Sequence, residues 1–521
     1  MKKTVTQLSW IILLGISLCV SCKPKEDQET PIEGEEELVV MTSPLPQDVL
    51  PSCVVDSTSF NSWFESGKAT ENGMVNAANS VTFTHQNNCD FYKWSQQMFL
   101  WITSPTKVSG KRVFESPVFY TVSTSFDRNE RKLIPHTPGM ILSAMPTIEK
   151  SVNNHNDSEE GQATGDALMS KDSAMVYYIT MVNDVYAEFL SAVSEGKMGG
   201  KQFPTTQAEL DSIVNYATTK GIKLPDANAL AMEIKTSWVE ASTISETELA
   251  NYVVIDAYIP TYEKTPTKWT ILNKSVKTKL ALLGVHIVGS AAGHPEMIWS
   301  TFEHQNNAPS LSYSYIDKNN QVQKVAADTS GNWVLNSNPK DTVNINISHM
   351  KFNADSIYAN FKTAPVNNTI SPSNTTKTKP WGVANVGVPN PENATAAASN
   401  SQVISINNSV FNQLPGNDVR KNYYLIGSTW TDSGLPPTGV SYSATNPNNT
   451  GSGVAIGTSQ LANSTMETYA QNGTAYASGG SCFACHSNYK TPTNNPNSIS
   501  HVYSDILAWK KQSGTITSEK K

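Results

Sequence analysis

Apolar residues between Asp90 and Ile102 recur at spacings of three and four, the period of a helix that packs one face on a core. The stripe is strongly aromatic and consists of Phe91, Trp94, Met98 and Trp101. Broader apolar faces predict further helices over residues 167–195, 206–219 and 226–241. The chain up to about residue 241 therefore has mainly helical patterning.

From Tyr252 onwards the pattern changes to that of extended structure. Runs rich in β-branched and aromatic residues at 253–259, 280–288, 297–304 and 422–430 are bounded by Pro, Gly or Asn, as strands of a sheet are. The Asn-, Thr- and Pro-rich stretch 364–400 is typical of a surface loop, and residues 458–472 and 500–511 are predicted to be helical. We find no internal repeat. The fold class predicted is α+β, with a body that contains an antiparallel sheet and several helices, followed by a helical C-terminal segment.

The first residues resemble an export signal. Lys2 and Lys3 precede an apolar run from Leu8 to Val20, which is short for a membrane span but suits the core of a signal peptide. Ser21 then precedes Cys22, as in the lipobox of bacterial lipoproteins, where cleavage leaves the cysteine as the lipidated first residue. Cys19 stands where such boxes usually carry Leu. A plain secretory signal or an uncleaved anchor is the alternative.

The domain boundaries follow from this beginning. Residues 1–22 are predicted to be the lipoprotein signal peptide, and the acidic stretch 23–49 a flexible tether with nothing to bury. Residues 50–440 would form the α+β body and residues 441–521 a segment packed on it. We expect an exported protein of the cell envelope, an outer-membrane lipoprotein that faces the periplasm or the cell surface and contacts the membrane through its N-terminal lipid.

Composition and charge limit the classes of binding partner that the sequence predicts. The chain has 521 residues, is 38% hydrophobic and contains 11 Trp, so most of it is expected to fold. The formal charge is -7, and no dense basic run follows the first residues. The electrostatic footprint of a nucleic-acid-binding protein is therefore absent from the sequence.

The chemistry is concentrated in residues 481–487, S-C-F-A-C-H-S. Cys482 and Cys485 with His486 directly behind them form the C-x-x-C-H signature of covalent haem attachment. Two thiols three residues apart lie on one side of a helical turn, where they can add to the two vinyl groups of a haem, and the next imidazole reaches the iron. The sequence predicts one haem c with His486 as its proximal axial ligand.

Three other readings of this motif are a zinc half-site, a redox dithiol and a structural disulfide. A zinc ion would want four ligands, and the local candidates are Cys482, Cys485, His486 and His501, without a second C-x-x-C. A thioredoxin-like dithiol would be expected in a βαβ setting, which the pattern lacks. Haem attachment fits the exported compartment, the spacing and the adjacent histidine together.

The motif also accounts for the cysteines. Of six Cys, one leaves with the signal, Cys22 carries the lipid and two hold the haem, so Cys53 and Cys89 remain. In an oxidising compartment this pair is expected to form a disulfide that closes a loop of roughly 36 residues. Two buried thiols are the alternative.

The sixth iron ligand is left open by the sequence. Small c-type cytochromes place the motif first and a methionine ligand later, whereas here no Met follows Cys485. The nearest candidates are His501 and Met466, and the more distant ones are His294, Met297, His304, His349 and Met350. An open, five-coordinate iron would move the function from electron transfer towards peroxidase or ligand-binding chemistry.

A second unusual run is H-P-E-M-I-W-S-T-F-E-H, residues 294–304. The alternation of a strand puts Glu296, Ile298, Ser300, Phe302 and both histidines on one face and Met297, Trp299, Thr301 and Glu303 on the other. His294, Glu303 and His304 are candidate pocket residues against the haem, with Glu303 or His304 moving protons. The alternative is an ordinary strand with a polar end.

Residues 482–486 match the motif of c-type cytochromes. Together with the long N-terminal part, the run H-P-E-M-I-W-S-T-F-E-H and the stretch L-A-N-S-T-M-E-T, they resemble large secreted bacterial mono-haem proteins of the cytochrome c family. The resemblance implies haem binding without implying a substrate.

The function expected is electron transfer at the cell envelope, to or from a redox partner protein or a small-molecule electron donor or acceptor. One alternative is a peroxidase-like haem enzyme with an open iron. The other is a surface binding lipoprotein whose haem is structural or sensory.

Overall fold

The computed structural model describes residues 45–123, 132–144, 162, 166–353, 356–360, 369–382, 392–393, 395–442, 447–458, 460–472 and 481–507. These residues belong to one compact unit. The predicted signal peptide, with Cys22, and most of the predicted tether lie outside the described residues. Leu45 and Val49 are buried, so the body begins ahead of residue 50, where the sequence had placed its start. Within the described ranges, no helix has the length and apolar character needed to cross a membrane.

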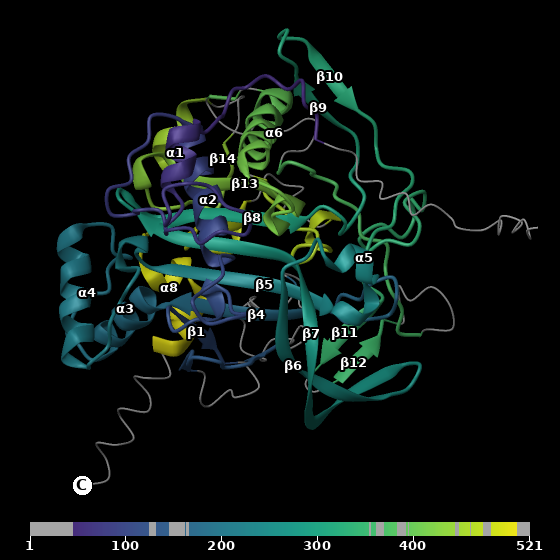
Figure 1. The fold of residues 1–521 in the computed structure, drawn as a ribbon, viewed down its shortest axis with the longest axis horizontal. Coiled ribbons are helices and arrows are strands. Elements are labelled where there is room, and N and C mark those ends of the chain that lie inside the picture. The colour runs from purple at the N-terminus through teal and green to yellow at the C-terminus, as the bar shows by residue number, and fades with distance from the viewer. Residues whose placement is uncertain are drawn as a thin grey trace, which may run out of the picture. The chain divides into compact units, whose positions relative to one another are not determined.

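One large sheet organises the body (Figure 1). Its main path runs β14-β13-β8-β7-β5-β4-β1-β2, while β3, β6, β11 and β12 branch from it and β9 pairs with β10 separately. All of the pairings between these strands are antiparallel except that of β3 with β6. Together with the helices described below, the sheet gives the α+β class expected from the sequence.

The strands are β1 Phe119–Val122, β2 Leu133–Pro135, β3 Leu142–Ser143, β4 Tyr177–Asn183, β5 Met232–Glu240, β6 Val254–Lys264, β7 Lys268–Ala291, β8 His294–His304, β9 Tyr313–Ile316, β10 Val322–Val325, β11 Met350–Asn353, β12 Ser356–Ala359, β13 Tyr423–Thr431 and β14 Ala455–Gly457. The α-helices are α1 Ser57–Ser62, α2 Asn88–Ile102, α3 Asp184–Ser194, α4 Gln207–Thr219, α5 Glu246–Leu249, α6 Ala396–Gln413 and α8 Pro496–Ile499. The 3-10 helices are η1 Val113–Glu115, η3 Ala227–Ala229, η4 Ala241–Thr243, η5 Val419–Asn422, η6 Asp432–Gly434, η7 Pro447–Ser452, η8 Ala470–Asn472 and η9 Cys482–Ala484.

The predicted aromatic helix is α2, and it covers one face of the sheet. Asn87 caps its first turn by accepting a hydrogen bond from the backbone N–H of Cys89. All four residues of the predicted stripe are buried. The ring of Phe99 stacks on that of Phe302 at 4.3 Å between centroids, which fixes α2 against β8.

The opposite face of the sheet is covered by α3, α4 and the residues after 460. In this layer Trp299, on the face of β8 turned away from α2, contacts Phe483 at 5.7 Å between ring centroids. Asn463 donates a hydrogen bond of 2.8 Å to Thr301, on the same face of β8. The C-terminal residues therefore share the central sheet with the body, and β14 adds a strand to its edge.

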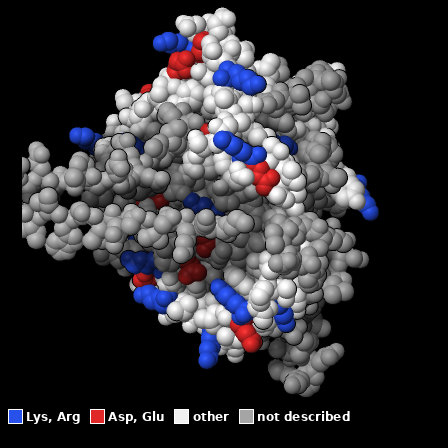
Figure 2. Space-filling model, turned by 90° about the vertical axis from the view of Figure 1, so that its right-hand side faces the viewer, with Lys and Arg blue, Asp and Glu red and all other residues white. Residues whose placement is uncertain are grey.

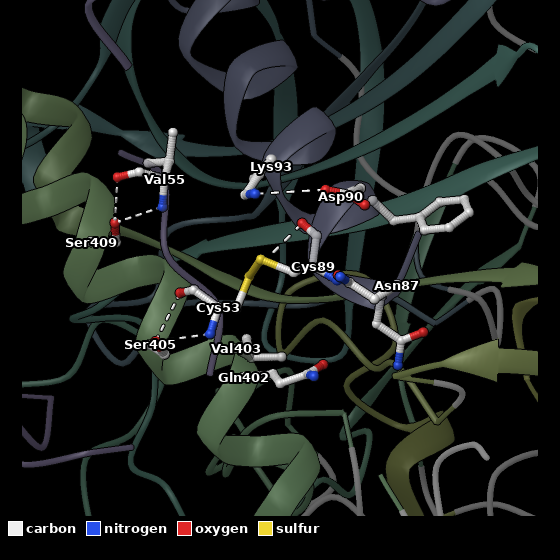
Figure 3. The surroundings of a disulfide bond; sticks show 12 residues. Cys53, Val55, Asn87, Cys89, Asp90, Lys93, Gln402, Val403, Ser405 and Ser409 are labelled. Atoms are coloured by element: carbon white, nitrogen blue, oxygen red, sulfur yellow. Dashed lines mark hydrogen bonds and ion pairs between the residues drawn. A yellow bond between two sulfur atoms is a disulfide. The ribbon is translucent and has the colours of Figure 1, made fainter. Parts of the chain in front are cut away.

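Helix α6 was missed by the sequence, which predicted a surface loop up to residue 400. Figure 3 shows why its polar face is buried: Ser405 accepts a hydrogen bond from the backbone N–H of Cys53 and donates one to its carbonyl oxygen. Cys53 is in turn joined to Cys89 of α2 by a disulfide, with 5.3 Å between Cα atoms. The chain before α1 is thus fastened to two helices at once.

Three of the predicted helices are wrong in whole or in part. The range 226–241 is β5 preceded by a 3-10 turn, and only the second half of 167–195 is helical, because residues 177–183 form β4. Both strands lie inside the sheet with neighbours on each side and bury residues on both faces, which hides the alternation expected of a strand. The range 458–472 contains turns and η8 in place of a helix, so the C-terminal segment is less helical than predicted. Residues 501–507 are helical, as expected of that part of 500–511.

Figure 2 shows how the described charged side chains are distributed on one face of the molecule. On the face drawn in Figure 2, the described Lys and Arg side chains stand among Asp, Glu and uncharged residues without gathering in one basic patch.

Replacing both Cys53 and Cys89 by Ala should lower the free energy of unfolding by about 3 to 4 kcal/mol, because the disulfide closes a loop between residues separated by 36 positions and restricts the unfolded chain. Urea denaturation of the variant and the parent protein measures the difference. Addition of a reductant should destabilise the parent and leave the double variant unchanged. Equal stability of the two proteins would contradict the prediction.

Candidate functional site

The C-x-x-C-H motif forms a single tight turn. The backbone N–H groups of Cys485 and His486 both donate to the carbonyl oxygen of Cys482, at 3.2 and 3.1 Å. This turn contains η9, and it presents Cys485 to solvent while Cys482 is half-buried. The two sulfur-bearing residues are therefore three positions apart on one turn, the arrangement that attachment to two vinyl groups requires.

His486 is oriented by a hydrogen bond from its own ring. Its Nδ1 lies 3.0 Å from the carbonyl oxygen of Ile499, the last residue of α8. A carbonyl oxygen only accepts, so Nδ1 carries the proton and Nε2 of the neutral ring carries the lone pair. Metal-ligating histidines commonly have this second hydrogen bond, which fixes both tautomer and ring direction.

Two rings flank His486. Trp299 of β8 lies at 4.4 Å between ring centroids with a tilt of 48°, and His501 lies at 4.4 Å with a nearly parallel tilt of 20°. The indole N–H of Trp299 donates to the carbonyl oxygen of Glu296 at 2.9 Å, so the tryptophan is itself held in place. The unusual run 294–304 thus reaches the motif, through a residue that the sequence had not singled out.

The motif lies against an apolar cluster of side chains. Phe483 is fully buried in a cluster with Trp299, Val288, Ile499 and aromatic and aliphatic residues of α3 and α4, and Cys482 packs against this cluster. A haem is mostly apolar, and burial in such surroundings raises its potential relative to water. The thioether positions and the oriented imidazole border the same apolar cluster, so the residues present fit a haem c.

The thiol of Cys482 does not resemble that of a redox dithiol. Its pKa is raised well above the usual value, first by burial and then by the nearby charges of Glu467 and Cys485. Reactive dithiols instead have a lowered thiol pKa. Among the described side chains, no three His, Cys, Asp or Glu residues converge on a point that could hold a metal ion. The raised pKa of Cys482 disfavours the thioredoxin-like reading.

Neither local candidate for the sixth ligand faces His486 across a space for iron. His501 stacks face to face on His486, whereas two axial ligands must point at a metal from opposite sides of the haem plane. Met466 is fully buried in a different hydrophobic cluster, together with Leu283 and Tyr469. Of the more distant candidates, Met297 shares the apolar cluster of Phe483.

A histidine that the sequence analysis overlooked lies on the sheet beside the motif. His286 of β7 pairs in register with Thr301 of β8, next to Trp299, and its Nε2 lies 2.8 Å from a carboxylate oxygen of Glu467. His286 helps to hold the pKa of Glu467 below its usual value, against the opposing effect of burial. The charge of Glu467 acts on Cys482, so this pair belongs to the surroundings of the motif. The sequence carries no signal for this histidine, because its position beside the motif depends on the register of β7 and β8 in the folded sheet.

The three pocket candidates of the second run are not brought together. Glu303 accepts hydrogen bonds from the backbone N–H and the hydroxyl of Ser464, under the C-terminal segment. His304 stacks on Tyr252 at 3.6 Å, and burial lowers its pKa to about 3, so the ring is neutral near neutral pH and unsuited to proton donation. His294 lies on the α2 side of the sheet, where its Nδ1 is 2.9 Å from Glu296.

No protein-family model, curated protein or solved structure matches the chain. The assignment of the site therefore depends on the motif and on its geometry in this fold.

In the haem-free chain, Cys485 should react with iodoacetamide at least about tenfold faster than Cys482 at pH 8. Cys485 is exposed, whereas the thiol of Cys482 is half-buried and its raised pKa leaves little of the reactive thiolate. Peptide mass mapping after timed alkylation gives the two rates. Equal rates would show that the turn does not bury Cys482 as described.

Proposed function

We propose that this protein is a mono-haem c-type electron-transfer protein of the cell envelope, carrying its haem on Cys482 and Cys485 with His486 as the proximal ligand. The observation that supports this most directly is the hydrogen bond from His486 Nδ1 to the carbonyl oxygen of Ile499. It leaves the lone pair on Nε2, the atom that would bind the iron, in the residue directly after Cys485. The bound haem supplies one-electron chemistry.

We further propose that His286, held by Glu467, supplies the sixth ligand. A carboxylate partner is the usual support of a metal-bound imidazole, and the 2.8 Å contact between His286 and Glu467 provides it. With Nε2 donating to the carboxylate, Nδ1 of His286 carries the lone pair. Two imidazole ligands would favour a low-spin iron that exchanges electrons without binding substrate.

The same pair favours a second candidate function, a peroxidase-like activity. In that case the carboxylate-oriented imidazole of His286 would act as a base beside an open iron, since a histidine oriented in this way can take and return a proton. The two functions differ in whether His286 occupies the iron, and the binding of external ligands separates them.

The mature protein, expressed in a host that attaches haem c, should have the mass of the chain plus one haem and a low-spin spectrum in both redox states. Replacing His486 by Ala should leave the thioether bonds intact but abolish the native low-spin spectrum, because the proximal ligand is lost. His501→Ala is the matched control and should keep the native spectrum. A chain of unmodified mass after passage through this maturation system would overturn the proposal of a haem protein.

The ferrous native protein should bind carbon monoxide slowly or not at all, whereas His286→Ala should bind it at least about tenfold faster, because a coordination position is then open. Stopped-flow absorbance in the Soret band measures the rates. Rapid binding by the native protein, combined with turnover of hydrogen peroxide that is lost in His286→Ala, would favour the peroxidase-like function instead.

A further inference from the structure

We propose that Glu296, His294 and His85 form a proton-binding relay that takes up a proton from water when the haem held by Cys482 and Cys485 is reduced. This inference rests on the proposed haem function and adds proton coupling to it. Two of its residues, His294 and Glu296, belong to the run 294–304, and His85 joins them from a distant part of the sequence.

The inner end of the relay is a buried carboxylate. Glu296 is completely buried, and its Oε1 accepts hydrogen bonds from the backbone N–H of Thr431 at 3.1 Å and from His294 Nδ1 at 2.9 Å. Its Oε2 is also buried, and none of the described residues forms a hydrogen bond with it. One oxygen of this carboxylate therefore accepts both hydrogen bonds, and His294 is the side chain through which it connects to the outer end of the relay.

The outer end of the relay is open to solvent. His294 is only 1% exposed, but its Nε2 lies 3.2 Å from Nε2 of His85, which is an exposed residue. When Nδ1 of neutral His294 donates to Glu296, its Nε2 accepts the hydrogen of His85 Nε2, and Nδ1 of His85 is left to take up a further proton. Protons can therefore pass from water through His85 and His294 to Glu296.

The charges around His85 come from several elements. Asp90 of α2 and Asp432 of η6 favour its protonation, as does Glu296, and Lys93 of α2 is itself paired with Asp90 at 3.6 Å. Burial and the neighbouring His294 oppose protonation more strongly, so the pKa of His85 lies below its usual value. The aromatic rings of Phe83 and Phe91 complete the surroundings. An added negative charge nearby would shift this balance towards the protonated pair.

The connection to the haem side crosses the sheet in two contacts. The ring of His486 lies 4.4 Å from that of Trp299, and the indole N–H of Trp299 donates to the backbone carbonyl of Glu296 at 2.9 Å. Met297, which lies between Glu296 and Trp299 in the sequence, has a left-handed backbone with φ of 68°. Every residue of β8 is buried, so a charge arriving on the iron is poorly screened from the carboxylate.

The balance of the coupled step is one electron and one proton. An electron from the redox partner protein converts ferric to ferrous iron, and a proton from water enters at His85, so that the charge of the site as a whole does not change. Reduction is then easier at low pH, where the proton is available. The midpoint potential should therefore fall as pH rises.

Spectroelectrochemical titration of the full-length haem-loaded protein tests this coupling between about pH 4 and 7, the range of carboxylate and imidazole titration. The expected slope approaches 59 mV per pH unit, the value for one proton per electron. A pH-indicator dye in weakly buffered solution should record proton uptake when ascorbate reduces the protein. A potential that does not change with pH would overturn the relay.

Two variants assign the effect to these residues. Glu296→Gln removes the carboxylate, and His85→Gln removes the exposed end of the relay without disturbing the core; each should reduce the slope at least twofold while the haem spectrum is kept. Glu303→Gln, a second buried carboxylate of the same strand without a histidine partner, is the matched control and should keep the slope.

A slope that persists in both His85→Gln and Glu296→Gln, or that is lost in Glu303→Gln instead, would assign the proton to other groups such as the haem propionates and overturn the proposal. These failures leave a haem-loaded, redox-active protein. Failure of the proposed function would instead appear earlier, as a protein without covalent haem, and would remove both proposals.

Discussion

The burial of β8 on both faces is the constraint on which the rest of the structure depends. All eleven residues of the strand are buried, although six of them are polar or charged: His294, Glu296, Ser300, Thr301, Glu303 and His304. A buried polar group without a partner costs roughly 1 to 3 kcal/mol, so each needs a neighbouring element to satisfy it. The hydrogen bonds that result join Ser300 to Ser95 of α2, Thr301 to Asn463, Glu303 to Ser464 and Glu296 to Thr431. The same bonds place α2 on one face of the sheet and the C-terminal residues on the other.

The candidate site follows from this arrangement. Its internal geometry is local, since the turn at Cys482 and the bond between His486 and Ile499 lie within 20 residues of one another. Its surroundings are not local, because Trp299 and His286 come from the centre of the sheet. A short motif thus supplies the thiols and the imidazole, while the strands beneath it supply their neighbours.

The helices and strands that the sequence predicted correctly are those with a recognisable period of apolar residues. The stripe of α2 and the strands around 253–304 and 422–430 have such patterns and are present in the structure. Helix 226–241 was wrong because β5 buries residues on both faces, so Leu230, Met232, Ile234 and Trp238 fit either period. Helix α6 was missed for a different reason: its many Ser and Asn side chains have weak helix preference, and bonds such as that from Asn407 to the carbonyl of Leu425 bury polar positions beside the apolar Val403, Ile406 and Val410. In the site, the motif was visible in the sequence, whereas His286 and His85 depend on strand register and on a contact across 209 positions.

The span of the contacts that fasten the N-terminal segment sets an order for folding. Gln47 bonds to Asn408 across 361 positions, and Cys53 to Ser405 across 352, whereas Cys53 and Cys89 are separated by only 36. Contacts between distant parts of a chain form slowly, because a long loop must be closed before they contribute. A chain that emerges N-terminus first can therefore close its disulfide while α6 has yet to appear, and until α6 docks the cross-linked segment and α2 keep their apolar surfaces uncovered. The interval between these two events is when the protein is most exposed to aggregation and most in need of a chaperone.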